Sequence, residues 1–489
     1  MTAGAVAAAK RGPVELTVRG LILGALITLV FTAANVYIGL KVGLTFASSI
    51  PAAVISMAIL RAFKNATIQE NNIVQTVASA AGTLSSINFV LPGLVMIGWW
   101  TGFPFWESFG ICVFGGILGV MYSVPLRRAM VTGSDLPYPE GVAAAEVLEV
   151  GAAAHEGTDA AAVAESRTGL AVVFWGSVVS ALYYVIVQTK LFAGGITHYV
   201  RAGASAVTGI DIGLSFALIG IGHLVGITVG IAMLAGIALA WVVLVPIYSA
   251  LHAPNPDTAA LAVDVFRHQV RFVGAGAIGV AALWSIGRLA GPVVGGVVSS
   301  LRSSRARGTG EDTRPLTEQD IPFPTVVLIS AVCLIPIAVL LVAFLNGTPL
   351  AGAAFPLVFG ALVYIVLAGI IVAAVCGYMA GLIGSSNSPV SGLAILTVLG
   401  ASLLLVGVAH PSDPLAQKAL VAYALFVTAV ILNIATISND NLQDLKTGQL
   451  VHATPWKQQT ALVVGVVFGA IVIPPILNVL NTSFGFVGS

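Results

Sequence analysis

The stretch "GLILGALITLVFTAANVYIGL" (20–40) carries no charged side chain along its whole length. A run of about 20 apolar residues is long enough to cross the hydrocarbon core of a bilayer as an α-helix. Runs of this kind recur through all 489 residues, and short alternating segments typical of a membrane β-barrel are absent. The sequence therefore predicts an all-α polytopic membrane protein.

The composition agrees with a bundle that is largely out of contact with water. Hydrophobic residues make up 58% of the chain and charged residues 8%, against roughly a quarter charged in soluble proteins. This apolar composition makes the lipid bilayer the expected surroundings. The net charge of +1 suggests no nucleic-acid partner. Three cysteines lie inside apolar runs without metal-binding spacing, so we expect no disulfide framework, no metal site and no cofactor. The 54 glycines favour close helix packing.

About 13 transmembrane segments are expected from the apolar runs. They are 20–40, 44–62, 72–98, 108–126, 168–188, 209–230, 231–250, 272–299, 323–345, 352–382, 391–409, 416–436 and 458–480. Basic residues cluster on one side of these segments, in the N-terminal stretch and in the loops at 127–128 and 302–314. The positive-inside rule then predicts a cytoplasmic N-terminus, in a bacterial inner (plasma) membrane.

A polar insert divides the chain into two predicted halves. Residues 301–322 are basic, then acidic, and lack apolar periodicity, so we expect a cytoplasmic linker between residues 1–300 and 323–489. The halves share "YIGLKVG" (37–43) and "YMAGLIG" (378–384), each followed by a proline. Asn71 and Gln75 in the first half match Asn439 and Gln443 in the second. This pattern predicts an internal repeat with a site between the repeats, although chance in a biased composition is the alternative.

Polar side chains interrupt the apolar runs at 64–93, 381–396 and 436–450. Backbone that leaves helical form at membrane depth must be buried in protein or line a cavity. We therefore expect broken or re-entrant helices at these three places; the alternative is cytoplasmic turns with capping residues. Amides, hydroxyls and tyrosines in or beside the polar stretches are the candidate substrate-binding residues: Tyr37, Asn71, Asn72, Gln75, Tyr138, Ser386, Asn387, Asn439 and Gln443.

The stretch "LPYPEGVAAAEVLE" (136–149) places acidic residues at the start of a helix. Its prolines disfavour helix before Glu140, whose carboxylate then falls in the first turn, where the helix dipole favours it. A carboxylate in a protein cavity can take and release a proton and so couple a proton gradient to transport. The candidate proton-coupling residues are Glu140, Glu146 and Asp440. For Glu146 the alternative is a solvated helix face.

Several of these stretches together resemble the oligopeptide transporter family, in its prokaryotic branch related to the yellow-stripe-like transporters. They are "NVYIGLKVGL" (35–44), "NNIVQTVASAAGTL" (71–84), "LPYPEGVAAAEVL" (136–148), "GLIGSSNSPVSGLAIL" (381–396) and "NDNLQDLKTGQLVHATPWKQQ" (439–459). The resemblance covers residues from about 15 to 480. It implies about sixteen spans, so the second half is expected to be shortened at its C-terminus. The plant members have serine where Glu140 stands.

The resemblance implies a secondary active transporter, not an enzyme, that carries short oligopeptides or peptide-like small molecules in symport with protons. A metal-chelate transporter and a passive channel are the alternatives. The chain has no Walker A motif for ATP and no GxSxG motif of a hydrolase. The sequence does not indicate the substrate, the direction of transport or the oligomeric state.

Overall fold

The computed structural model divides into two compact units, Met1–Arg167 with Trp284–Ser489 and Thr168–Leu283. This division differs from the predicted halves, and the internal repeat stays a prediction. The structure describes residues 14–42, 48–63, 65–156, 168, 171–172, 175–176, 178–183, 185–187, 189, 191–203, 205–253, 255–281, 283–284, 287, 291, 315–386, 388, 390–409 and 413–486.

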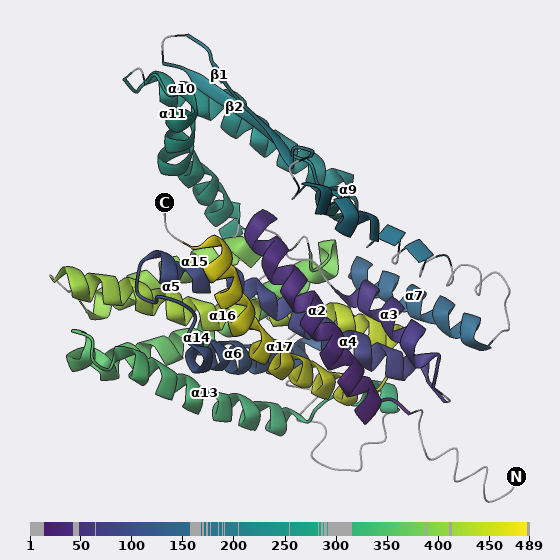
Figure 1. The fold of residues 1–489 in the computed structure, drawn as a ribbon. Helices are drawn as coiled ribbons and strands as arrows, with labels where there is room; N and C mark the ends of the chain where they lie inside the picture. The colour runs from purple at the N-terminus through teal and green to yellow at the C-terminus, as the bar shows by residue number, and fades with distance from the viewer. Residues whose placement is uncertain are drawn as a thin grey trace, which may run out of the picture. The chain divides into compact units, whose positions relative to one another are not determined.

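The first unit is built from helices in its described part (Figure 1). Its α-helices are α2 (Val18–Val42), α3 (Ser49–Leu60), α4 (Ile68–Leu84), α5 (Leu91–Met96), α6 (Phe105–Arg127), α7 (Pro139–Glu156), α13 (Phe323–Leu345), α14 (Ala354–Ile383), α15 (Val390–Val408), α16 (Pro414–Leu450) and α17 (Pro455–Phe484). Short 3-10 helices occur at η1 (Ser85–Phe89), η5 (Leu316–Glu318) and η6 (Ala351–Ala353), and a π-helix, η2 (Arg128–Thr132), continues α6.

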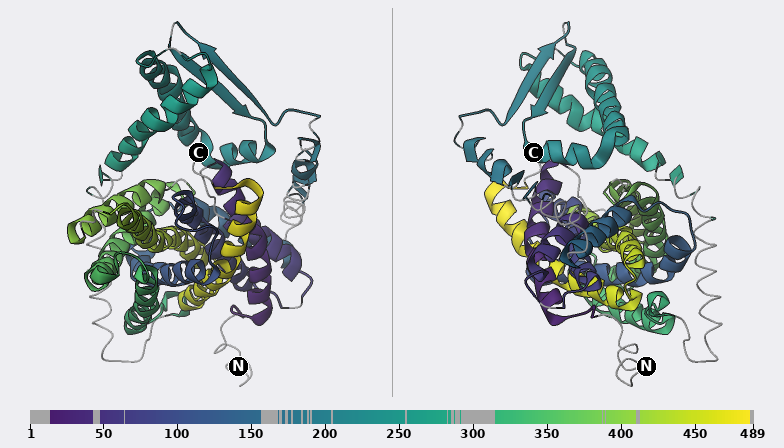
Figure 2. Two further views of the ribbon diagram at one scale, coloured as in Figure 1. Left: turned by 60° about the vertical axis from the view of Figure 1, so that its left-hand side comes forward. Right: turned by 90° about the vertical axis from the view of Figure 1, so that its right-hand side faces the viewer.

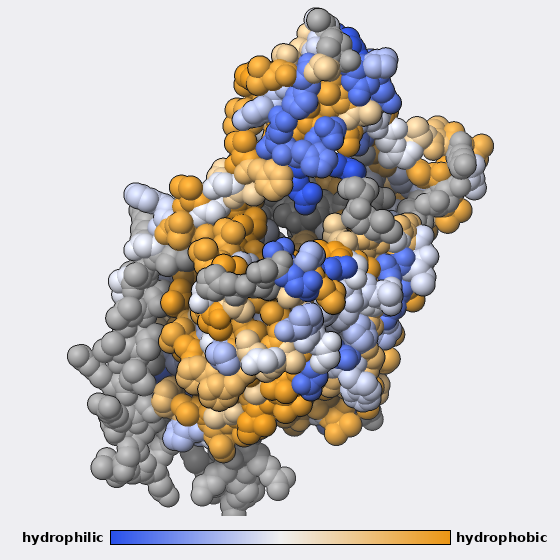
Figure 3. Space-filling model, turned by 90° about the vertical axis from the view of Figure 1, so that its left-hand side faces the viewer, coloured by the Kyte–Doolittle hydropathy of each residue, from blue (hydrophilic) through white to orange (hydrophobic). Residues whose placement is uncertain are grey.

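Among the described residues, nine helices are long and apolar enough to cross a membrane, which confirms the polytopic all-α prediction. They are Val18–Leu40, Ile68–Met96, Phe105–Thr132, Gly226–Ala250, Phe323–Leu345, Ala351–Ile383, Val390–Val408, Pro414–Leu450 and Pro455–Phe484. The predicted span 44–62 contains the shorter helix α3. Apolar side chains on the outer faces of α13 and α14, such as Ile335 and Phe359, are exposed, and apolar side chains cover much of the face in Figure 3.

Helix α16 is the centre of the first unit and packs against α6, α14, α15 and α4 (Figures 1 and 2). Two glycines let α6 approach it closely. A Cβ at Gly115 would lie 2.8 Å from the Val430 carbonyl oxygen, and a Cβ at Gly119 would lie 2.9 Å from that of Ile434. Small residues four apart serve this purpose between membrane helices, so backbone contact sets the α6–α16 distance.

The three polar interruptions have different outcomes. In 64–93 the α-helix gives way to the 3-10 helix η1 at Ser85, so this region is not one regular helix. Helix α14 ends at Ile383 and α15 begins at Val390, within the stretch 381–396 where a break is predicted. The break predicted at 436–450 is wrong, because α16 runs continuously for 37 residues. Its polar side chains are buried against neighbouring helices, and many of them form hydrogen bonds there without opening the backbone.

The second unit contains an antiparallel hairpin of β1 (Gly195–Arg201) and β2 (Val207–Gly213), with Arg201 opposite Val207. Both strands carry several β-branched residues, which favour extended backbone. The chain continues through α9 (Phe216–Ile237), η3 (Ala238–Leu244), α10 (Val245–Ala250), α11 (Thr258–Val265) and η4 (Phe266–Val270). The predicted span 209–230 is therefore wrong at its start, where β2 lies. A small core gathers Val207, Val245, Leu261, Ala262, Val265 and Val270.

Candidate functional site

The polar face of α16 lies in the interior of the first unit. Its amide, hydroxyl and carboxyl side chains are buried: Asn439, Asp440, Gln443, Asp444 and Thr447. Helix α4 presents a polar face of its own, on which Asn72, Ser79 and Thr83 are seven and four residues apart and so share one side. Side chains of the two helices meet, with Asp440 beside Ser79 and Thr83 and Asp444 beside Gln75.

The connection between α14 and α15 brings backbone donors to this interior. At Gly384 φ is +93° and ψ is 156°, a conformation that is essentially confined to glycine. A Cβ at this position would also lie 2.8 Å from Glu140 Oε1. The turn directs the next two backbone N–H groups at the carboxylate of Glu140: Ser385 N lies 3.1 Å from Oε2, and Ser386 N lies 3.0 Å from Oε1.

Glu140 lies in the first turn of α7, after Pro139, as the sequence predicts. Its carboxylate thus accepts two backbone hydrogen bonds from the α14–α15 connection, and the Ser385 hydroxyl is a third, close partner. The side chain is half-buried. Glu140 is therefore part of a contact between two distant parts of the chain and does not lie in an open loop.

The hydroxyl of Ser385 lies between two carboxyl groups. It is close to Glu140 Oε2, and its Oγ is 3.1 Å from Asp440 Oδ1. The other oxygen of Asp440 accepts from Ser79 and from Thr83 at 2.7 Å. A serine hydroxyl has one hydrogen to donate, and an ionised carboxylate has none. Both contacts of Ser385 can be hydrogen bonds only if one of the two carboxyl groups carries a proton.

Asp444, one helical turn after Asp440, has a different environment. Its Oδ1 accepts a hydrogen bond from Gln75 Nε2, while its Oδ2 is buried and has no hydrogen-bond partner in the described part of the chain. The Oε1 atom of Gln75 and both polar atoms of the Asn72 side chain are likewise buried without such a partner. Unsatisfied polar atoms in a protein interior are uncommon, and each one calls for a physical explanation.

Other amides of this region act as braces between helices. Gln443 accepts from Gly141 N at 2.7 Å and donates to the Ala380 carbonyl at 2.5 Å, which ties the start of α7 to the end of α14. Asn439 donates to the Ser385 carbonyl at 2.9 Å. Gln458 of α17 donates to Thr76 at 3.0 Å. The helices around the carboxyl groups are thereby held together by side chains far apart in sequence.

Tyr138 packs against the end of α14. Its backbone N–H donates to the Gly381 carbonyl at 2.8 Å, and its φ of +44° is unusual for a residue other than glycine. A Cβ at Gly381 would lie 2.9 Å from the tyrosine ring, so glycine is required for this packing. Burial raises the pKa of the Tyr138 hydroxyl. The hydroxyl is therefore a neutral donor, without a hydrogen-bond partner among the described residues.

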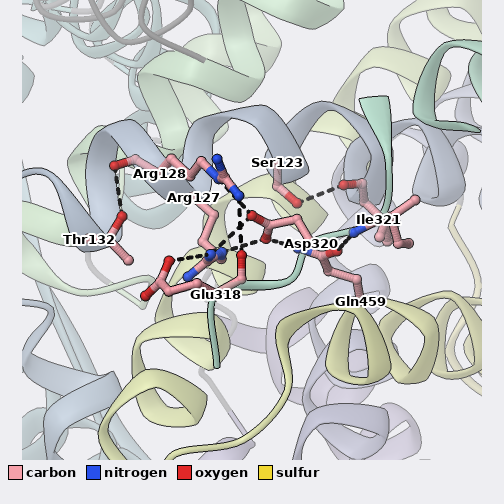
Figure 4. Close-up of polar contacts among 9 residues, drawn as sticks. Ser123, Arg127, Arg128, Thr132, Glu318, Asp320, Ile321 and Gln459 are labelled. Atoms are coloured by element: carbon pink, nitrogen blue, oxygen red, sulfur yellow. Dashed lines mark hydrogen bonds and ion pairs between the residues drawn. The ribbon is translucent and has the colours of Figure 1, made fainter. Parts of the chain in front are cut away.

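A buried ion network lies at the end of α6 (Figure 4). Arg127 Nε donates to Asp320 Oδ1 at 2.5 Å, and Arg127 Nη2 donates to Asp320 Oδ2 at 3.0 Å. Arg128 Nε and Gln459 Nε2 also contact this carboxylate, at 3.0 and 2.8 Å. The Glu318 carboxylate lies 3.2 Å from Arg127. Sequence reasoning missed this network, because it assigned residues 301–322 to a linker.

The predicted site residues have different positions in the structure. Those that meet around the α14–α15 connection and α16 are Gln75, Tyr138, Glu140, Ser386, Asn439, Asp440 and Gln443. Asn71 instead accepts from Ser56 of α3 at 2.6 Å, and Tyr37 of α2 lies against Phe484, with ring centroids 6.3 Å apart. Glu146 is exposed on α7, and Asn387 lies outside the described residues. Sequence reasoning did not select Ser79, Thr83 or Ser385, whose hydroxyls carry the contacts to the carboxyl groups.

Similarity to known proteins extends along nearly the whole chain. The family model described as OPT oligopeptide transporter protein matches residues 15–489. A Haemophilus influenzae protein named "Putative oligopeptide transporter" is 44% identical over 461 residues, which are 93% of this chain and 71% of that protein. The "Probable metal-nicotianamine transporter YSL14" of Oryza sativa subsp. japonica is 24% identical over 532 residues, covering 97% of this chain and 68% of that protein. "Metal-nicotianamine transporter YSL2" from the same plant is 28% identical over 193 residues, covering 30% of this chain and 27% of that protein.

Proposed function

The chain belongs to the oligopeptide transporter family, and we propose that it carries short peptides or peptide-like small molecules in symport with protons. It is a membrane transporter and not an enzyme. The observation that carries the proposal is the single hydroxyl of Ser385 between the carboxyl groups of Glu140 and Asp440. The proposed location is a bacterial inner membrane, with the N-terminus in the cytoplasm.

The proton-carrying unit is the trio of Glu140, Ser385 and Asp440. One proton on either carboxyl group allows both contacts of Ser385 to be hydrogen bonds, and without that proton one contact is lost. The trio continues into further hydroxyls, since Ser79 contacts Asp440 and lies 3.0 Å from Ser49 Oγ. Proton transfer through such contacts requires only hydroxyl reorientation and short shifts of the shared proton.

Coupling to conformation follows from where Ser385 is attached. Its backbone and side chain both hold Glu140, which belongs to α7, while its side chain also contacts Asp440 of α16. A movement of the α14–α15 connection about Gly384 changes all of these contacts together. The protonated and deprotonated states of the trio thus favour different positions of this connection. A conformational switch requires such a difference in interaction between its two states.

The substrate is proposed to reach the buried amides that lack partners. Asn72 of α4 and the Oδ1 atom of Asn439 of α16 offer donors and acceptors that suit peptide amides and carboxylates. The metal-nicotianamine transporters among the relatives favour a second candidate cargo, a metal chelate. The proton-carrying trio can drive the transport of either cargo in the same way, so the identity of the cargo needs its own experiment.

Uptake by proteoliposomes tests the proposal. Purified protein is reconstituted, and accumulation of a labelled dipeptide is measured with and without an inward proton gradient, in competition with other peptides and with metal–nicotianamine complexes. We expect gradient-driven accumulation by the wild type. Glu140→Gln keeps the shape but loses the titrating carboxyl, so it should abolish accumulation and retain exchange of substrate across the membrane. The control Glu149→Gln removes an exposed acid of the same helix and should accumulate substrate normally.

Gradient-driven accumulation by Glu140→Gln at the wild-type level would contradict the coupling role. Equal uptake with and without the gradient by the wild type would indicate a passive channel instead.

A further inference from the structure

Asp444 is a fully buried carboxyl group with one donor at hydrogen-bond distance among the described residues, the Gln75 amide, and with the Ser79 and Ser49 hydroxyls nearby. Its Oδ1 accepts from the Gln75 amide, and its Oδ2 has no hydrogen-bond partner in the described ranges. No lysine, arginine or histidine forms an ion pair with it in that same part of the chain. A buried carboxylate without a compensating positive charge costs several kcal/mol. Asp440, one turn earlier, differs because three hydroxyls surround it.

A second, independent feature points to the same place. Gln75 has no exposed surface, and its Oε1 atom also has no hydrogen-bond partner among the described residues. Because Nε2 of this amide donates to Asp444, its oxygen is held beside the carboxyl group. Asp444 Oδ2 and Gln75 Oε1 are thus two buried oxygen acceptors on side chains that are hydrogen-bonded to each other, and neither atom has a hydrogen-bond partner among the described residues. Asn72, almost one turn earlier on α4, adds a third unsatisfied side-chain oxygen to this part of the helix.

We infer that Asp444 and Gln75 form a binding site for a singly charged cation, either an alkali ion or a primary ammonium group of the substrate. A cation neutralises the carboxylate and satisfies both orphaned oxygens at once. The ligands suit a single charge, since hard cations take oxygen ligands and divalent ones usually take several carboxylates. Groups of three or more His, Cys, Asp or Glu side chains that could hold a metal ion are absent from the described residues.

This site is separate from the proton-carrying trio. Its partner on α4 is Gln75, whereas Asp440 is bound by Ser79 and Thr83, one and two turns further along α4. Asp440 and Ser79 lie close enough to act on Asp444 electrostatically, so the two sites are neighbours; the test below measures cation binding alone, without substrate or a proton gradient. An absence of cation binding would not contradict the proposed symport with protons. An absence of proton-driven accumulation would not contradict the cation site.

Thermal unfolding of the purified full chain in detergent, without substrate, tests the inference. The midpoint is measured in NaCl, LiCl, KCl and methylammonium chloride, against N-methyl-D-glucamine chloride at equal ionic strength. The large cation cannot enter a buried site, so it controls for salt. We expect at least one small cation to raise the midpoint by a few degrees in a saturable manner. A rise with an alkali ion assigns the site to that ion, and a rise with methylammonium alone assigns it to an ammonium group of the substrate.

Variants then locate the effect. Asp444→Asn should abolish the rise, and Glu149→Gln, which removes an exposed acid, should keep it. Gln75→Met preserves the side-chain volume but removes the amide oxygen. It should raise the cation concentration that gives half of the maximal rise in the midpoint about tenfold. This variant replaces Asp444→Asn in the test if Asp444→Asn does not fold. The inference is overturned if no small cation exceeds N-methyl-D-glucamine in the wild type. It is also overturned if the folded variants at Asp444 and Gln75 keep the wild-type response.

Discussion

Replacing Asp320 by asparagine should strongly destabilise the first unit, because Asp320 neutralises a buried arginine. Arg127 is 1% exposed and Asp320 is 4% exposed, and two nitrogens of the guanidinium contact the carboxylate at 2.5 and 3.0 Å. Arg128 and Gln459 donate to the same carboxylate, so four donors lose their charged acceptor together. Asparagine keeps the shape but offers one oxygen and an N–H2 group, which faces the donors of Arg127.

Breaking a buried pair by removal of one partner costs about 3–5 kcal/mol, because the other charge stays buried. Glu318, the remaining acid near Arg127, is 37% exposed at a distance of 3.2 Å and compensates poorly. Glu318→Gln is therefore the matched control, with an expected loss of about 0.2–1 kcal/mol, as for exposed ion pairs. The expected order of stability is wild type, then Glu318→Gln, then Asp320→Asn well below both.

Equilibrium unfolding in detergent micelles, followed by tryptophan fluorescence, measures these free energies. The double variant Arg127→Met with Asp320→Leu removes both charges and should recover much of the loss, because apolar residues can replace a buried pair with little cost. A loss below about 1 kcal/mol for Asp320→Asn, or equal losses for Asp320→Asn and Glu318→Gln, would refute the reasoning.

Two further variants test the α14–α15 connection. Ser385→Ala removes the hydroxyl between Glu140 and Asp440 and should reduce gradient-driven accumulation at least about tenfold. Ser385→Thr keeps a hydroxyl and should retain more of the accumulation. Equal accumulation by the two variants would contradict a role for the hydroxyl. Gly384→Ala places a Cβ 2.8 Å from Glu140 Oε1 at a φ of +93°, with a cost of about 1–3 kcal/mol, and should lower the melting temperature and uptake. Gly407→Ala, in α15, where the added Cβ meets no side chain or neighbouring helix within 4 Å, is the control and should lower neither the melting temperature nor uptake.

Hydropathy was sufficient to predict most of the membrane segments, because each apolar run must be buried in lipid or protein wherever it packs. It failed where local composition was ambiguous. Residues 209–213 read as part of an apolar span, yet they belong to β2, which pairs with a strand earlier in the chain. The polar stretch 436–450 read as a break, yet α16 is continuous there. Asp440 and Asp444 in this stretch accept hydrogen bonds from α4 residues more than 350 positions away, and no local pattern contains that information.

The candidate site was predicted in the same uneven way. Glu140 could be selected because its first-turn position follows from the neighbouring prolines. Ser385 could not, since its importance depends on a glycine turn that aims it at two helices from different parts of the sequence. The polar surroundings of Asp320 in the sequence predict a linker, whereas its partner Arg127 lies 193 positions earlier in a buried helix end. Ion pairs across such distances are set by packing and not by local sequence.

The two carboxyl groups around Ser385 differ in what holds them, and this difference bears on mechanism. Asp440 is bound by side chains of α4, on a continuous helix that packs at the centre of the first unit. Glu140 is bound by backbone N–H groups that exist only because α14 ends at Gly384. A shift of the α14–α15 connection therefore removes the stabilisation of Glu140 while leaving two hydroxyls on Asp440. The proton between them should follow, because a carboxylate that loses its donors becomes the better proton acceptor. In the proposed symport with protons, the carboxyl group that holds the proton and the position of the α14–α15 connection would then depend on each other.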